Sequence, residues 1–237
     1  MRFNTHWLPL ALLSSLLLSC ASPQPSLPLK QQPIIAANTT DSDAIGWRSV
    51  SFHLQWQRDS EPDWTIGTLI AGEIIAPILS ELRPQITAWR FHRRAADDAT
   101  GHTFNFIVYS SAHTAEKIYA RVTDNSNTME LKQSGQITAI VFDPLDRNLK
   151  PKREDTSDTT WPPAIKKTWP VFIMGASQMW LDLIMQLKSE LPNDNNLFNT
   201  YQTIQQQITA LWKQHGQHAW LHHLNAVYGY SPIDMRF

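Results

Sequence analysis

Residues 89–109, WRFHRRAADDATGHTFNFIVY, decide the fold. Apolar and polar side chains alternate on both sides of the polar segment 97–101, which contains a glycine. Period-two alternation is typical of half-buried β-strands, so this stretch predicts two strands joined by a turn. On the first strand, Trp89, Phe91 and Arg93 are expected on one face and Arg90, His92 and Arg94 on the other. On the second strand, Phe104, Phe106 and Val108 are expected opposite Asn105, Ile107 and Tyr109.

The predicted hairpin also carries a dense group of cations, which makes it the best candidate for a site. Arg90, Arg93 and Arg94 are candidate ligand-binding residues, because a guanidinium binds a carboxylate or a phosphate with two parallel hydrogen bonds. Arg93 is expected on the same face as Trp89 and Phe91, where a charge needs a partner. The alternative interpretation is a solvated face on which Asp97 and Asp98 balance the arginines.

The segments around the hairpin predict an α+β fold. An alternating strand opens near Trp47, and a helix follows from about Glu61 to Leu82, with Pro77 inside it. A second helix is predicted over 112–122, and the β-branched stretch 137–142 predicts a fourth strand. The order βαββαβ is that of a ferredoxin-like sandwich, which we place at residues 46–143. This architecture hosts many unrelated functions and therefore names none.

A C-terminal helical region is expected to follow the sandwich. Residues 144–168, rich in Pro, Asp, Lys, Arg and Thr, predict a long loop, and Pro170 is well placed at a helix start. The helix after Pro170 is apolar nearly all round, which indicates burial on several sides. Either the last helices cover it or a partner does. We expect the helices of residues 169–237 to cover one another and to pack on the core.

The N-terminus predicts secretion. A charged start and a short apolar run end at Leu17-Leu18-Ser19-Cys20, and Cys20 is the only cysteine. This stretch resembles the lipobox of bacterial lipoproteins, in which residues 1–19 would be removed and the Cys20 thiol would carry a diacylglycerol. Residues 20–45, rich in Ser, Pro, Gln, Asn and Thr, predict a flexible tether. Ala21 follows Cys20 in place of an aspartate, so we expect lipid anchoring at the periplasmic face of the outer membrane.

Composition excludes several classes of function. A net charge of −1 gives no broad attraction to nucleic acid or to an anionic membrane surface, and leaves only local basic patches open. A single cysteine excludes an intrachain disulfide, and lipidation would exclude it as a nucleophile. The sequence contains none of the usual hydrolase, metalloprotease, phosphate-loop or redox motifs, and we expect no cofactor. His215, His218 and His222 are candidate metal ligands at helical spacing, with solvent-facing histidines as the alternative.

Residues 47–187 are similar to the small C-terminal domain of lantibiotic dehydratases and of thiopeptide-type bacteriocin biosynthesis proteins. The features that carry the resemblance are Pro77 before Ile78-Leu79, the aromatic and arginine strand 89–93, and the turn at Gly101-His102. The resemblance implies a shared scaffold and a habit of binding peptides. Residues 104–107 stand where the family has the alternating arginines that serve its elimination chemistry, so that activity is not implied.

Three functions are compatible with the sequence. We expect a non-catalytic lipoprotein that binds an envelope protein, a peptide or a glycan. The second is a structural or accessory role in envelope assembly. The third is a peptide- or anion-binding site, with or without catalysis, centred on Arg93 and His102.

Overall fold

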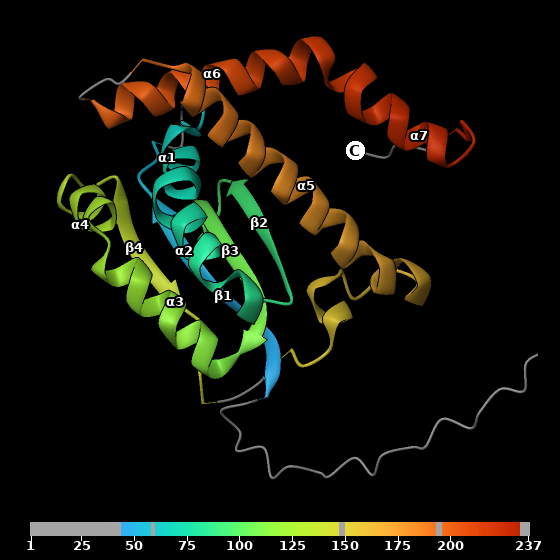
Figure 1. Cartoon of the computed structure of the whole chain (residues 1–237), viewed down its shortest axis with the longest axis horizontal. Helices are drawn as coiled ribbons and strands as arrows, with labels where there is room; N and C mark the ends of the chain where they lie inside the picture. Colours follow the sequence, from blue (N-terminus) through green and yellow to red (C-terminus); the bar gives the residue numbers. More distant parts are fainter. Residues whose placement is uncertain (1–43, 58–59, 147–149, 193–195, 233–237) are drawn as a thin grey trace, which may run out of the picture. The chain divides into compact units, whose positions relative to one another are not determined.

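The computed structural model describes residues 44–57, 60–146, 150–192 and 196–232 (Figure 1). Cys20 and the predicted leader lie outside these residues. The four strands form one antiparallel sheet in the order β2-β3-β1-β4, so the predicted ferredoxin-like order and the C-terminal helical region are confirmed. The strands are β1 (Ile45–Leu54), β2 (Ala88–Ala95), β3 (His102–Ser111) and β4 (Ile137–Phe142).

The hairpin forms as the alternation predicts. Trp89 pairs with Val108, Phe91 with Phe106 and Arg93 with Phe104 across β2 and β3. Gly101 closes the turn with a φ of 64°, a conformation that residues with a Cβ rarely adopt. Arg93 therefore lies on the same face as the buried aromatic rings, whereas Arg90 and Arg94 lie on the other face.

One continuous helical segment crosses the sheet and contains a wider π turn. It consists of α1 (Thr65–Leu69), η2 (Ile70–Ile75), α2 (Ala76–Leu82) and η3 (Arg83–Gln85). The Ala76 N–H donates to the carbonyl of Ala71, five residues earlier, immediately before Pro77. A proline ring clashes with the carbonyl four residues before it in a regular helix, and the π turn widens the helix at this point. The predicted interruption at Pro77 is thus a local widening, and the helix continues to Leu82.

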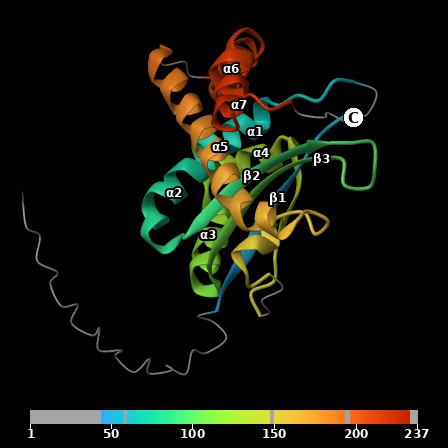
Figure 2. The ribbon, with the colours of Figure 1, turned by 90° about the vertical axis from the view of Figure 1, so that its right-hand side faces the viewer.

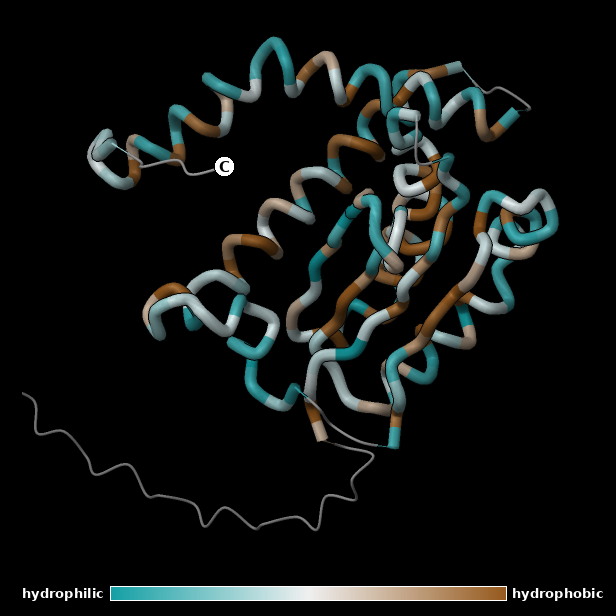
Figure 3. Tube along the Cα trace, turned by 180° about the vertical axis from the view of Figure 1, so that it is seen from behind, coloured by the Kyte–Doolittle hydropathy of each residue, from teal (hydrophilic) through white to brown (hydrophobic). Residues whose placement is uncertain are grey.

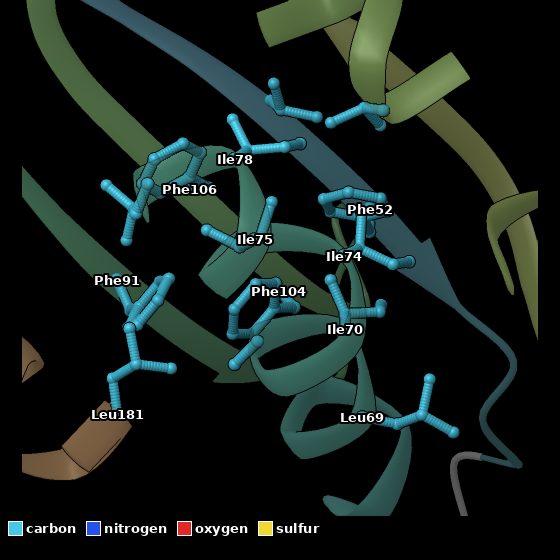
Figure 4. Close-up of a cluster of buried hydrophobic side chains, with 14 of the residues drawn as sticks. Phe52, Leu69, Ile70, Ile74, Ile75, Ile78, Phe91, Phe104, Phe106 and Leu181 are labelled. Atoms are coloured by element: carbon cyan, nitrogen blue, oxygen red, sulfur yellow. The ribbon is translucent and has the colours of Figure 1, made fainter. Parts of the chain in front are cut away.

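The core lies between this segment and the sheet. Figure 4 shows Phe52, Phe104 and Phe106 of the strands facing Ile70 and Ile74 of the helix. All five side chains are buried, and dispersion and the hydrophobic effect favour such close packing.

Two further helices, α3 and α4, follow strand β3. Helix α3 (Ala112–Asp124) buries Ala115, Ile118 and Val122 against the core. Its N-terminus is capped by the Ser111 side chain, which accepts from the Thr114 N–H. A further helix, α4 (Ser126–Gln133), follows it and was not predicted. Figures 1 and 2 show the segment Thr65–Gln85 and α3 on one face of the sheet.

The long loop is shorter than predicted. A 3₁₀ turn, η4 (Arg153–Thr156), forms inside it, and α5 (Pro163–Glu190) begins seven residues before Pro170. The prediction that a helix starts at Pro170 is therefore wrong. Pro170 has no N–H for the Lys166 carbonyl, but the Ser157 hydroxyl donates to that carbonyl at 2.9 Å. A side chain from the preceding loop thus replaces the missing helical donor.

Helix α5 covers the β2 edge of the sheet. The Ser177 hydroxyl accepts a hydrogen bond from the Phe91 N–H at 3.0 Å and donates to the Ile173 carbonyl. Leu181 and Ile184 are buried against the core. An edge strand with free N–H groups invites pairing with other chains, and α5 blocks this pairing at β2.

The last helices only partly match their prediction. Helix α6 (Leu197–Gly216) buries Tyr201, Ile204 and Ile208 and packs on α1 and α5. The chain then continues as η5 (Gln217–His222) and α7 (His223–Val227), whose principal contacts are with α6 and with each other. Phe172 and Val171 of α5 remain 51% and 56% exposed, so the expectation that the last helices cover α5 is wrong for its N-terminal half.

Within the described residues, the segment Thr65–Gln85 is long and apolar enough to cross a membrane by length and composition. However, 72% of its most apolar window is buried inside the fold. The same length and composition are found in the core helices of globular domains, and this segment is such a core helix.

Candidate functional site

Arg93 lies at the centre of a cluster that joins four parts of the fold. Its guanidinium carbon is 4.8 Å from the ring centroid of Trp64 and 4.8 Å from that of Trp180, so the cation is held between two indole rings. Its Nη2 atom donates to the Trp64 carbonyl at 3.0 Å and to the Gln205 Oε1 atom at 3.2 Å. The sequence indicates that this charge needs a partner. Two aromatic ring faces and two neutral oxygen atoms take that role.

Burial shapes the electrostatics of Arg93. Desolvation lowers its pKa to about 10, and the charge of Asp63 opposes that shift. The side chain is still cationic at neutral pH. Its Nε atom is buried and has no hydrogen-bond partner. A Cβ placed on Gly67 would lie 3.7 Å from this nitrogen, so Nε faces the backbone of α1.

His102 lies in the same cluster as Arg93, because both side chains contact Trp64. Its ring is 4.9 Å from that of Trp64 and 6.3 Å from that of Trp56, edge-on to both. Burial is the largest cause that lowers its pKa, and the charge of Arg93 lowers it further. The Nδ1 atom is buried without a partner. The imidazole is therefore neutral at neutral pH.

This arrangement can hold helices on the sheet. It links β2 through Arg93, the start of α1 through Trp64, α5 through Trp180 and α6 through Gln205, whose Oε1 atom also accepts from the Thr68 hydroxyl at 2.6 Å. Two buried nitrogens remain without partners, one on Arg93 and one on His102. Six other buried side-chain atoms among the described residues also lack partners, so these two nitrogens are compatible with a small hydrogen-bonding ligand but do not by themselves mark a ligand site.

The three candidate arginines do not form one site. Arg90 lies on the other face, where its Nε donates to the Thr156 hydroxyl at 2.8 Å and its guanidinium stacks over Trp169. Burial lowers the Arg90 pKa to about 10. Arg94 pairs with Asp98, and this hydrogen-bonded pair holds the pKa of Asp98 well below its ordinary value. The alternative interpretation, in which an aspartate balances the arginines, describes Arg94 correctly.

The C-terminal histidines gather without forming a metal site in the part of the chain that the structure describes. The rings of His218 and His222 stack with centroids 5.2 Å apart, and His223 meets both rings edge-on. His222 Nε2 lies 3.3 Å from the Tyr230 hydroxyl. Among the described residues, no three or more His, Cys, Asp or Glu side chains are placed to hold a metal ion. His215 is not among the stacked rings.

A second polar network, missed in the sequence, joins three helices. Glu73 of the π turn accepts a hydrogen bond from the Tyr201 hydroxyl at 2.6 Å and pairs with Lys188. A Cβ on Gly72 would lie 2.2 Å from that hydroxyl, so glycine is needed for Tyr201 to pack here. Burial and the Glu73 carboxylate raise the Tyr201 pKa far above its ordinary value, which excludes it as a phenolate at neutral pH. The network therefore acts in packing.

An open apolar hollow lies elsewhere, between α5 and α7. It has a volume of about 780 Å³. Figure 1 shows the two helices that line it, and Figure 3 colours apolar stretches along both. We call it the α5–α7 groove, and its walls are Ile165, Lys167, Thr168, Trp169, Val171, Phe172, Leu224 and Tyr228. The all-round apolarity of α5 is the sequence signal that could have indicated an exposed surface here.

Comparison with protein-family models, with curated proteins and with solved structures finds no match to this chain.

Proposed function

We propose that this chain is a bacterial lipoprotein of the cell envelope, anchored through Cys20 at the periplasmic face of the outer membrane, with a non-catalytic binding or accessory role. The observation that carries the proposal is the apolar leader ending at Leu17-Leu18-Ser19-Cys20, with the chain's only cysteine at the cleavage point. The start of the first strand at Ile45 supports it, since about 25 residues separate the anchor from the fold. A chain of that length spans tens of ångströms when extended.

The geometry of the polar clusters supports a role other than catalysis. The Arg93 guanidinium is enclosed between two indole rings, and Glu73, Tyr201 and Lys188 bind one another. Catalytic acids, bases and nucleophiles need access to a substrate and pKa values near the working pH. The α5–α7 groove, by contrast, presents open apolar surface of the kind that binds partners.

Mass spectrometry of the protein recovered from bacterial membranes tests the anchor. We expect a mature chain that begins at Cys20 and carries a diacylglycerol on its sulfur, and that fractionates with the outer membrane. A Cys20→Ser variant should keep the leader and lose the lipid. A mature chain that begins elsewhere, or that carries a free thiol, would contradict the proposal.

A second candidate function is an anion- or peptide-binding site at Arg93 and His102. The two buried nitrogens without partners favour it, and the resemblance to lantibiotic dehydratases implies peptide binding. NMR of the His102 ring during titration with inorganic phosphate or a short acidic peptide tests it. A saturable shift that disappears in Arg93→Lys would support the site, and the absence of any shift would remove it.

A further inference from the structure

Residues 212–230, which include the end of α6 together with η5 and α7, expose apolar side chains, and so does the start of α5. No other described residue covers these side chains. We call residues 212–230 the C-terminal arm. Val227 and Tyr228 of the arm are 81% and 71% exposed, and Trp212 and Leu221 are also exposed. On α5, Ile165, Val171 and Phe172 are exposed as well. Isolated apolar side chains are common on protein surfaces, but a run on two facing helices marks an interaction surface.

The arm has the periodicity of an amphipathic helix. Trp220, Leu224 and Val227 recur at steps of four and three residues, and His218 and His222 lie on the other side. Trp212 and Trp220 stack with centroids 5.3 Å apart, over Gly216, where a Cβ would come within 3.1 Å of both rings. A helix of this length is marginal in water unless its apolar side is buried.

Within the two helical segments the formal charges have one sign, and the exposed Asp158 of the preceding loop is close enough to Lys166 for that charge to lower the Asp158 pKa. Residues 163–181 of α5 and residues 196–232 contain no aspartate and no glutamate. The same segments carry Lys166, Lys167 and Lys213, together with four histidines of the arm. The chain as a whole has a net charge of −1 with histidines counted as neutral, so these two segments, which carry lysines and no acidic residues, depart locally from its composition. The occupant that this surface fits is therefore apolar and anionic.

Building on the proposed lipoprotein role, we infer that the arm and the first half of α5 lie on the surface of a bilayer that contains anionic phospholipid. Basic helices with Trp, Leu and Val on one side insert at the boundary between headgroups and acyl chains. Tryptophan and tyrosine are enriched at that depth. Direct contact would add a second attachment to the diacylglycerol on Cys20.

Two other occupants fit less well. A partner helix seated in the α5–α7 groove would leave Val227 and Trp212 in water, because neither lines the groove. A bilayer covers side chains inside the groove and beside it. The same surface of a second copy carries the same cations, so it offers no charge complementarity.

Vesicle binding by the chain that begins at Ala21 tests the inference without the acyl anchor. The core is formed by residues 50–208, so removal of the leader and Cys20 leaves the fold intact. We expect the protein to sediment with vesicles of phosphatidylcholine and phosphatidylglycerol, with a blue shift of tryptophan emission, and to bind pure phosphatidylcholine less. The double variant Leu224→Asp/Val227→Asp should bind the mixed vesicles with an affinity that is lower by a factor of about ten or more. The variant Lys167→Gln/Lys213→Gln should lose the preference for phosphatidylglycerol.

Val141→Asp on β4 is the matched control, since Val141 is also an exposed valine, at 51%. It should bind vesicles like the unaltered chain, and thermal melting should show that all variants are folded. Absence of binding to the mixed vesicles, or equal weakening by Val141→Asp, would overturn the inference. A dimer in sedimentation analysis that only Leu224→Asp/Val227→Asp dissociates, without vesicle binding, would assign the surface to self-association instead. Acylation of Cys20 is measured separately in cells, so this inference and the proposed function can fail independently.

Discussion

At the scale of single residues, Arg93 shows how a buried cation is stabilised without a direct ion pair among the described residues, with the charge of Asp63 acting only from a distance. Two indole faces and two neutral oxygens replace the ion pair. The sequence predicted that Arg93 lies on the apolar face and needs a partner. It could not identify the partners, because Trp64 is 29 residues away and Gln205 is 112 residues away. Strand alternation is local, whereas these contacts depend on how the helices pack.

Arg93→Ala should therefore destabilise the fold. We expect a loss of about 3 kcal/mol in the free energy of unfolding, from two cation–π contacts and two hydrogen bonds of about 1 kcal/mol each or less. Urea denaturation measures it. Arg94→Ala, which removes an exposed ion pair on the same strand, is the matched control and should change little. Equal effects of the two substitutions would show that the indole sandwich does not stabilise the protein.

His102 should make stability depend on pH. Because its pKa is lowered in the folded protein, the unfolded chain takes up a proton first as the pH falls. Stability should be full above the ordinary histidine pKa of about 6.5 and should decline below it. In His102→Gln this decline should be smaller, as measured by urea denaturation at pH 8 and at pH 5. An unchanged difference between the two pH values would contradict this assignment.

At the scale of elements, the hairpin and β4 were predictable because apolar and β-branched residues mark the strands directly. Helix α4 was not, since only Thr128 and Leu131 of its eight residues are buried and no apolar period arises. The predicted start of α5 was wrong because a proline often occupies the first turn of a helix, and Pro170 was interpreted in that way. The donor that allows Pro170 inside the helix, the Ser157 hydroxyl, belongs to another segment.

The contact between α5 and the sheet edge gives a prediction at this scale. Ser177→Ala leaves the Phe91 N–H buried without its acceptor, which should cost about 1–3 kcal/mol of stability. Amide hydrogen exchange at Phe91 should accelerate with it. Ser189→Ala, on the same helix but with an exposed side chain, is the control and should leave both measurements unchanged. Unaltered exchange at Phe91 in Ser177→Ala would mean that the hydrogen bond does not protect the edge.

At the scale of the whole molecule, the stability of the fold and the C-terminal arm should be separable. The core cluster ends at Ile208, and the principal contacts of η5 and α7 are with α6 and with each other. Removal of residues 217–237 should therefore change the free energy of unfolding by only about 0.5 kcal/mol or less. Ile204→Ala, inside the buried part of α6, should cost about 2–5 kcal/mol. A large loss on truncation would show that the arm belongs to the cooperative unit.

The two edge strands of the sheet, β2 and β4, differ in how much of their outer side is covered. At β2, helix α5 lies across the strand and Ser177 occupies one of its outward N–H groups. At β4, no further strand among the described residues pairs with the outer side, and Thr138, Ala139 and Val141 are exposed. We therefore expect an added strand, from a bound peptide or from a misfolded neighbour, to pair with β4 (Ile137–Phe142) and not with β2. Any assembly formed by strand addition would then extend the sheet from β4.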